Sequence, residues 1–309
     1  MHTIQTDGEV ETEPSLKPPA PSNDVTVQVS RPMPPLYKYC HPARVDVLKN
    51  QMIRYSSPAT LNDPFELRPH ISAIASPAHI EAEHHRLIGP TLDEELAKLP
   101  RHQRRKLARS KEIAALRANS SFAHEVARDV LPAVRDGLAR GIEAIGILCL
   151  TESPANLLMW AHYADSHRGF VIEFNPGSQF FDRRITHDDE LRHLRRVTYS
   201  TTRPSIVIAD TENFSAFLIK GTDWSYEAEW RIMDGIQFAS KIIGSGPEAI
   251  HLFAFPGAAI RSIIFGCRMP ETKRTEITKI VTSNREYQHV VCKQAKIDET
   301  HYRVLIPTE

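Results

Sequence analysis

The sequence has no apolar run long enough for a membrane-spanning helix. No segment approaches the roughly 20 consecutive apolar residues that such a helix needs. Residues 1–24 also lack the basic start and the apolar core of a secretory signal peptide. We therefore expect no membrane partner and place the protein in the cytoplasm.

Cysteine is scarce, and its spacing is uninformative for metal binding. No two cysteines form a Cys-x-x-Cys pair. In a chain of 309 residues this pattern argues against a disulfide framework or a zinc ribbon and indicates free thiols in a reducing compartment. The four cysteines are Cys40, Cys149, Cys267 and Cys292.

An excess of positive charge is absent too. Lys and Arg together number 38, as do Asp and Glu, so the formal net charge is zero. Proteins that bind nucleic acid usually carry a clear basic excess, which leaves only a local basic patch for that role. The basic runs at residues 101–111 and 192–196 could contact phosphates, but a solvated helix face is the favoured interpretation.

The common catalytic signatures are also missing. The sequence contains no GxSxG nucleophile elbow, no GxxxxGK[ST] phosphate loop, no GxGxxG dinucleotide fingerprint and no HExxH metal motif. These absences argue against a serine hydrolase of the nucleophile-elbow type, a P-loop nucleotidase, a Rossmann enzyme and a zincin.

Composition divides the chain into three regions. Residues 1–33 are rich in Pro, Glu, Thr and Ser and are predicted to be a disordered tail. Residues 34–309 are predicted to form a single α+β domain with a helical insertion at about 77–140. The insertion carries one apolar stripe and is expected to pack on the rest of the domain, and Pro132 should kink or split its last helix. The stripe consists of Phe122, Val126, Val130, Val134 and Leu138.

Hydrophobic periodicity predicts more strands than long helices outside the insertion, which indicates a mixed, mostly antiparallel sheet with flanking helices. Strands are predicted over residues 36–39, 52–56, 146–152, 169–174, 194–200, 224–233, 250–255, 260–265, 287–292 and 301–306. Helices are predicted over residues 42–50, 154–165 with Ser153 as the cap, 211–220 and 270–282.

Three blocks concentrate polar and aromatic residues beyond what these elements require. The first contains Tyr37, Lys38, Tyr39, Ser56, Ser57, Asn62, Asp63, Phe65 and Glu66. The second contains Trp160, His162, Tyr163, His167, Arg168 and Glu173. The third contains Trp224, Tyr226, Glu227, Glu229 and Arg231.

The two histidines of the second block allow three interpretations. His162 and His167 are five residues apart, which is not the spacing of the HExxH motif. They could line and cap a helix, contact a substrate or transfer a proton, or bind zinc together with a distant carboxylate. The helix-capping interpretation is the simplest.

In the third block, Glu227 and Glu229 are two residues apart, so a strand would place both carboxylates on one face with Arg231. One interpretation is a solvated ladder of opposite charges. The other is a glutamate held ionised to stabilise positive charge or to accept a proton.

The motifs resemble a bacterial family known only as the domain of unknown function numbered 2971. The resemblance covers about residues 35–266, and its most specific part is the MWAHYADSHRGFVIEF block. It brings no established reaction. The matching stretches are LYKY at Leu36, LNDPFE at Leu61, CLTES at Cys149, MWAHYADSHRGFVIEF at Met159 and WSYEAEWRI at Trp224.

A second resemblance is to ADP-ribosyltransferases, in the order of an aromatic strand, a helix ending in Lys-Asn, a strand ending in Ser and a late Glu-x-Glu. It implies that NAD is the substrate and that a late glutamate offsets positive charge on the ribose as the glycosidic bond breaks. The departure is a tyrosine at position 37 or 39, where many such enzymes have His or Arg.

This resemblance assigns roles to the candidate residues. Glu229, Glu227 and His162 are the candidate catalytic residues. No metal is expected, a nucleotide is the expected small-molecule partner, and the acceptor, nucleic acid or protein, stays open. The candidate substrate-binding residues are Tyr37, Tyr39, Ser56, Ser57, Asn62, Asp63, Trp160, His167, Arg168, Trp224 and Arg231.

Two other functions remain open. One is a non-catalytic ligand- or protein-binding module of a defence or toxin system, which the balanced charge and the missing signatures favour. The other is a His- or metal-dependent hydrolase built on His162, His167 and Asp165. The binding module predicts that His162, His167 and Glu229 do not converge on one cleft. If Tyr37, Ser57, His162 and Glu229 do not contact a single pocket of ligand size, the enzyme hypotheses fall together.

Overall fold

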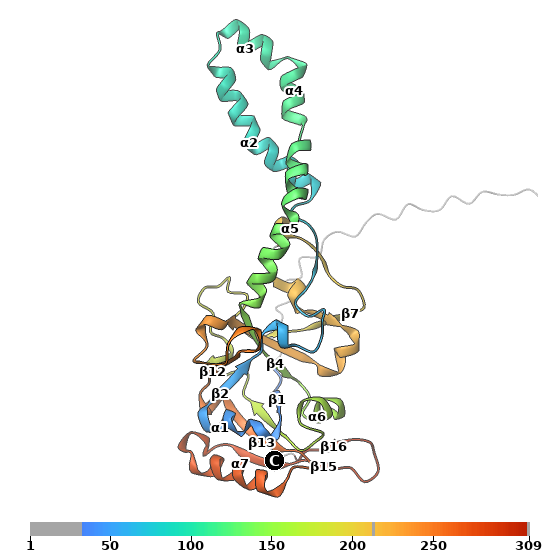
Figure 1. The fold of residues 1–309 in the computed structure, drawn as a ribbon, viewed down its shortest axis with the longest axis vertical. Helices are drawn as coiled ribbons and strands as arrows, with labels where there is room; N and C mark the ends of the chain where they lie inside the picture. The colour runs from blue at the N-terminus through green and yellow to red at the C-terminus, as the bar shows by residue number, and fades with distance from the viewer. Residues whose placement is uncertain (1–32, 212–213, 308–309) are drawn as a thin grey trace, which may run out of the picture. The chain divides into compact units, whose positions relative to one another are not determined.

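The computed structural model describes residues 33–211 and 214–307, so the tail predicted at residues 1–33 lies outside the described residues except for Met33. Residues Met33–Glu309 form one compact unit. Short strands and helices alternate along it, and the long helices cluster in the predicted insertion (Figure 1).

The main sheet has seven strands in the order β14-β13-β5-β1-β4-β10-β6. Only the β13–β14 pair is parallel, which confirms the α+β class with a mixed, mostly antiparallel sheet. Every residue of the inner strand β5 is buried. The strands are β1 (Leu36–Cys40), β4 (Ile145–Thr151), β5 (Phe170–Phe174), β6 (Arg195–Arg196), β10 (Glu229–Gly235), β13 (Ile260–Phe265) and β14 (Val291–Gln294).

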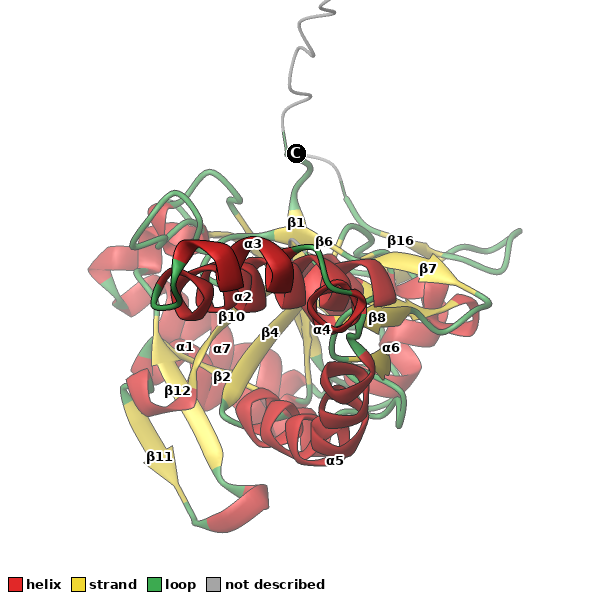
Figure 2. Ribbon diagram, turned by 90° about the horizontal axis from the view of Figure 1, so that it is seen from above, coloured by secondary structure: helices red, strands yellow, loops and turns green. Residues whose placement is uncertain are grey.

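A second sheet of three strands lies to one side of β4 and β10 (Figure 2). Its order is β11 (Lys241–Ile243), β12 (Ile250–Ala254) and β2 (Met52–Tyr55). A bridge between Ser56 and Ile147 joins the end of β2 to β4. The second sheet therefore brings Ser56 to β4, an inner strand of the main sheet.

Three small strand pairs complete the fold. The pairs β3–β8 and β7–β9 are parallel, and β15–β16 is antiparallel. The strands are β3 (His70–Ala73), β7 (Thr198–Ser200), β8 (Ser205–Val207), β9 (Ile219–Gly221), β15 (Lys296–Ile297) and β16 (Val304–Leu305).

Three short helices flank the sheets. The helix α1 (Asp46–Asn50) continues the 3₁₀ helix η1 (Pro42–Val45) and contacts α7 (Glu271–Ser283). The Asn156 side chain caps α6 (Leu157–Tyr163) by accepting from two backbone N–H groups of its first turn. Leu48, Phe174 and Ile277 are among the fully buried side chains of the main core.

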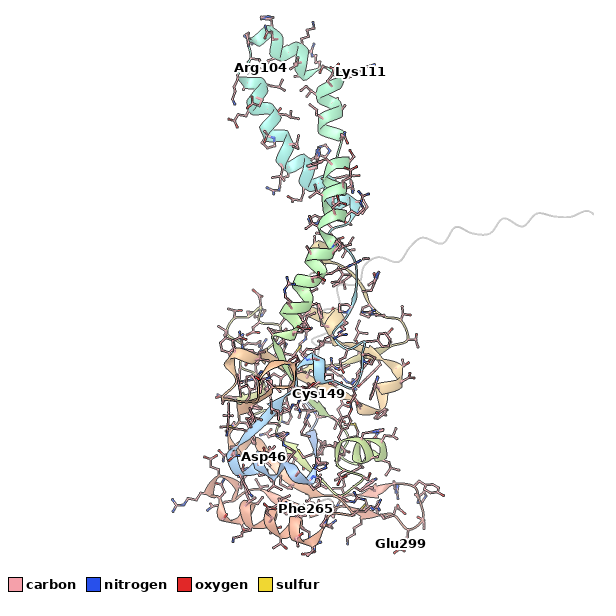
Figure 3. All side chains as sticks on the ribbon, in the orientation of Figure 1. Asp46, Arg104, Lys111, Cys149, Phe265 and Glu299 are labelled. Carbon is pink, nitrogen blue, oxygen red and sulfur yellow. The ribbon has the colours of Figure 1, made fainter. Side chains whose placement is uncertain are left out.

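The predicted insertion is the helical segment α2 (Pro77–Ala97), α3 (Arg101–Ala108), α4 (Lys111–Ala118) and α5 (Ser121–Glu143). It reaches away from the sheets, and α5 makes the contacts with β3 and β4 (Figure 1). The basic run lies at its far end, where Figure 3 labels Arg104 and Lys111, and all its Arg and Lys side chains are exposed. None of the described helices has the length and apolarity to cross a bilayer.

Two expectations for the insertion were wrong. The stripe does not pack on the domain along its length, because Phe122, Val126 and Val130 are exposed and only the end near Leu138 reaches a buried cluster. Pro132 also does not split the last helix, because α5 continues past it. Pro132 is exposed, so water can bond the carbonyl group that loses its helical donor.

Several predicted elements were also wrong, because pairing partners distant in sequence override local pattern. The predicted helix at 211–220 is instead the 3₁₀ helix η5 (Phe214–Leu218) followed by β9, with residues 212–213 outside the description. The predicted strand at 194–200 is divided between β6 and β7, which pair with β10 and β9. The predicted strand at 287–292 begins only at Val291, and the one at 301–306 is limited to β16.

Candidate functional site

A cavity of about 310 Å³ opens beside β1, β4, β10 and α6, and we call it the glutamate cavity. This volume is at the lower end of the range for small-molecule sites. Seven residues selected from the sequence line it: Tyr37, Tyr39, Ser56, Asn62, His162, Glu227 and Glu229.

The register of the main sheet explains part of this convergence. Thr151 of β4 pairs with Tyr37 of β1 on one side and with Glu229 of β10 on the other. Residues in one row across neighbouring strands point to the same face, with strands about 5 Å apart. The row therefore places the aromatic ring of Tyr37 and the carboxylate of Glu229 on one side of the sheet, with Thr151 between them.

Five charged side chains form a buried charge cluster beneath the cavity: Glu66, Lys220, Glu227, Glu229 and Arg231. Each is at most 7% exposed. Lys220 Nζ lies 2.6 Å from Glu227 Oε2, 3.1 Å from Glu229 Oε2 and 3.5 Å from Glu66 Oε1. Arg231 pairs with Glu229 and with Glu66. Three carboxylates thus share two cations, which leaves one negative charge in excess when all five are ionised.

Burial sets the protonation behaviour of this cluster. It raises the pKa of Glu229, and the neighbouring Glu227 adds to that effect while Lys220 opposes it. Burial disfavours the charged form of Lys220, but Glu229 and Glu227 prevail and raise its pKa. Burial lowers the pKa of Arg231 to about 9, which leaves its guanidinium protonated at neutral pH. Both cations therefore stay charged and hold the glutamates in place.

Glu227 reaches the cavity by a different route from the one expected. The predicted strand at 224–233 is wrong at its start, because the 3₁₀ helix η6 (Thr222–Glu227) precedes β10. Ala228 lies between them with φ 42° and ψ 55°, a left-handed conformation that turns the chain. Strand alternation therefore explains the shared face of Glu229 and Arg231 but not the position of Glu227. Since all three are buried, a solvated charge ladder is excluded.

The hydroxyl group of Tyr163 holds the second glutamate from the opposite wall. It donates a hydrogen bond to Glu227 Oε1 at 2.6 Å, and the Asn62 amide lies 3.4 Å from the same hydroxyl. Lys220 bonds the other oxygen of Glu227, so the carboxylate is fixed at both ends. Its orientation depends on α6, on η6 and on β9 together.

Ten cavity residues were not selected from the sequence as candidate site residues. Glu66 and Tyr163 belong to the polar and aromatic blocks of the sequence, and Glu66 also ends the LNDPFE stretch. This membership is the sequence feature that could have identified them. Lys220 carried no local signal, because its partners lie on other elements. The ten are Lys38, Thr60, Leu61, Glu66, Cys149 (labelled in Figure 3), Leu150, Thr151, Met159, Tyr163 and Lys220.

Other selected residues lie outside the glutamate cavity. Trp160 is fully buried and donates from Nε1 to the Pro154 carbonyl at 2.9 Å. His167 stacks on Trp160 with ring centroids 5.8 Å apart and lines a different cavity. Exposed Arg168 lies 3.4 Å from Asp165. These side chains support the fold around α6.

The rest surround the charge cluster. Ser57 is buried, and its carbonyl accepts from Thr60. The buried Asp63 bonds the backbone N–H of Phe65 at 2.9 Å, and Arg231 lies behind the cavity. Trp224 lines a neighbouring cavity, with Lys220 Nζ 4.9 Å from its ring centroid. The serine at the cavity is Ser56, so the expectation that Ser57 shares this pocket with Tyr37, His162 and Glu229 is wrong.

The described residues include no group of three or more His, Cys, Asp or Glu side chains placed to hold a metal. His162 and His167 line separate cavities.

The MWAHYADSHRGFVIEF block is mainly architectural. Asp165, Ser166 and His167 have φ values of 47°, 51° and 68°, so three consecutive residues turn left-handed after α6. Gly169 then passes so close to the Cys40 carbonyl that a Cβ atom would clash with it. This turn directs the chain into β5 and leaves His162 and Tyr163 facing the cavity.

A comparison with known protein families gives a match that begins at the MWAHYADSHRGFVIEF block. Residues 159–232 match the family described as Protein of unknown function (DUF2971). The resemblance to that family is therefore confirmed over these residues. The DUF2971 match begins in α6 and ends in β10, so it includes Lys220, both glutamates and Arg231. Searches of curated proteins and of solved structures found no match.

Proposed function

We propose that this protein cleaves the bond between nicotinamide and ribose in NAD, as an ADP-ribosyltransferase or an NAD glycohydrolase. The observation that carries the proposal is the row Tyr37–Thr151–Glu229, which gives one cavity an aromatic wall and a fixed carboxylate. Ser56 and His162 line the same cavity.

The charge of the site suits the substrate. The nicotinamide ring of NAD is a cation, and the charge cluster has one negative charge in excess when ionised. The Tyr39 hydroxyl donates to the Ser153 carbonyl at 2.9 Å, which fixes its ring at the cavity wall. The two tyrosines would hold the flat ring, and Ser56 would frame it.

The reaction requires stabilisation of positive charge. The bond between ribose C1′ and the nicotinamide nitrogen breaks, its electron pair leaves with neutral nicotinamide, and cationic character develops on the ribose. Glu229, held by Arg231 and Lys220, would offset this charge without reorienting. Water or an acceptor nucleophile would then bond to C1′ and lose a proton, which His162 at the rim could accept.

The test is nicotinamide release from NAD by the purified full chain, followed by chromatography. Glu229→Gln should reduce the rate by about a hundredfold or more, because it removes the fixed charge. Glu276→Gln on α7 is the matched control and should retain the rate. NAD binding and thermal unfolding of each variant separate lost chemistry from lost folding. A wild-type protein that neither binds nor consumes NAD would overturn the proposal.

One observation favours a second candidate, a binding module without catalysis. Both oxygens of Glu229 already accept hydrogen bonds from Arg231 and Lys220. A carboxylate so engaged could attract a cationic ligand and leave it intact. Binding of NAD with full recovery of the unchanged dinucleotide would select this candidate. In either case we expect the site to work in the bacterial cytoplasm, where its four cysteines stay free.

A further inference from the structure

A second cavity, of about 360 Å³, adjoins the glutamate cavity, and we call it the arginine cavity. Lys220 lines both cavities, so their walls meet at the buried charge cluster. The arginine cavity opens between the segment that follows Asn62, the loop after β7 and the start of η6. The residues that matter here are Phe65, Arg68, Ser200, Arg203, Lys220 and Trp224.

Its electrostatic character is opposite to that of the glutamate cavity. Arg68 and Arg203 are exposed, and neither forms an ion pair with a carboxylate within the described ranges. Of the two acids at the lining, Asp63 is buried beside Arg231, and Asp223 is exposed. Two guanidinium groups thus face one solvated carboxylate. Guanidinium groups without a protein partner, in a cavity, suit a bidentate anion such as phosphate.

Aromatic surface accompanies these cations. Phe65 is 65% exposed, and the Arg203 guanidinium lies 5.8 Å from its ring centroid. Arg203 Nε also donates to the Arg68 carbonyl at 2.7 Å, which fixes it beside that ring. An exposed phenylalanine beside an arginine offers a stacking face for a nucleobase.

We infer that the arginine cavity binds a nucleotide, with Arg68 and Arg203 on its phosphate and Phe65 against its base. The exposed Thr201 and Thr202 supply hydroxyl donors at the same lining, while the Ser200 hydroxyl donates to the Thr202 carbonyl at 2.8 Å and shapes the loop. The phosphate could belong to the adenylate half of NAD or to a nucleotide of an acceptor nucleic acid. Only this choice of source rests on the proposed function.

Calorimetric titration of the full chain with AMP and with adenosine tests the inference without any turnover. We expect AMP to bind at least about tenfold more tightly, because adenosine lacks the phosphate. Arg203→Gln and Arg68→Gln should each weaken AMP binding by about tenfold. Arg268→Gln, an exposed arginine at another cavity, should leave it unchanged. Phe65→Leu should weaken AMP but not ribose 5-phosphate.

The source is distinguished with the same variant. If Arg203→Gln raises the KM for NAD with kcat unchanged, the phosphate is that of NAD. If it abolishes binding of a ten-nucleotide single strand with the KM unchanged, the phosphate is that of an acceptor. The inference is overturned if AMP binds no more tightly than adenosine. It is also overturned if neither arginine variant changes the affinity for AMP. AMP binding through Arg203 in a protein that consumes no NAD overturns only the proposed function.

Discussion

The Arg231 guanidinium donates to both oxygens of the Glu229 carboxylate, from Nε to Oε1 at 2.7 Å and from Nη2 to Oε2 at 2.9 Å. The two residues are two positions apart on β10, so their side chains lie on the same face of the strand. Arg231 is fully buried and Glu229 is 3% exposed, so neither charge has water to replace its partner. The stability of each buried charge therefore depends on the other, and substituting one of the two residues tests this dependence.

Removing one partner should strongly destabilise the protein. Arg231→Met leaves Lys220 as the one cation shared by Glu229, Glu227 and Glu66, and we expect a loss of about 3–5 kcal/mol in the free energy of unfolding. Adding Glu229→Gln should recover part of that loss, because it removes an uncompensated charge. Arg168→Met, at an exposed pair, should cost at most about 1 kcal/mol. Urea denaturation measures all three, and equal effects of Arg231→Met and Arg168→Met would contradict the burial argument.

The hydroxyl group of Tyr163 should matter for the reaction rather than for folding. Tyr163→Phe removes the donor to Glu227, and we expect kcat for NAD cleavage to fall about tenfold with NAD affinity nearly retained. Tyr302→Phe, at a fully exposed tyrosine, is the control and should show the wild-type rate. Steady-state kinetics with a binding titration separates the two parameters. An unchanged kcat would show that this bond does not position Glu227 for chemistry.

A pH-dependent contribution to stability is expected from Asp189. Burial opposes its ionisation, but backbone N–H groups of Ile185, Leu191 and Arg192 and the Arg192 side chain lower its pKa from 3.8 to about 2. An acid with a lowered pKa stabilises the fold above its unfolded pKa of about 4, and this contribution is lost as the pH falls through 2.

Asp189→Asn should therefore be less stable than the wild type at pH 6, with a difference that shrinks between about pH 4 and pH 2. Denaturation in urea at several pH values measures the difference. Asp188→Asn is the matched control, because the neighbouring Asp188 side chain is 96% exposed. A difference for Asp189→Asn that does not vary with pH would show that its hydrogen bonds do not favour the ionised form.

The backbone crossing in the DUF2971 block should tolerate no side chain at position 169. A Cβ atom there would clash with the Cys40 carbonyl and crowd Ala164, so Gly169→Ala should lose about 3 kcal/mol of stability. Gly141→Ala on α5 has nothing within 4 Å of its added Cβ and should gain about 0.5–1 kcal/mol. Thermal unfolding followed by circular dichroism compares them, and equal shifts would refute the steric argument.

The sequence by itself determined the fold class, the helical insertion and the resemblance of residues 159–232 to the DUF2971 family. Buried strands such as residues 260–265 have a clear boundary because apolar runs and turn residues are local signals. Polar residues that a simple pattern does not require also pointed to Tyr37, Ser56 and Glu229, which the structure brings to one cavity.

Only the tertiary structure decided how that cavity is held together. Strand alternation could not place Glu227, because the left-handed Ala228 breaks the strand before Glu229. Strand alternation also could not identify Lys220 as a cavity residue, because its partners lie on η6 and β10. It could not show that His162 and His167 line different cavities. A local sequence pattern cannot predict the register between distant strands, the turns of the chain or the burial of charges. These are properties of the assembled fold.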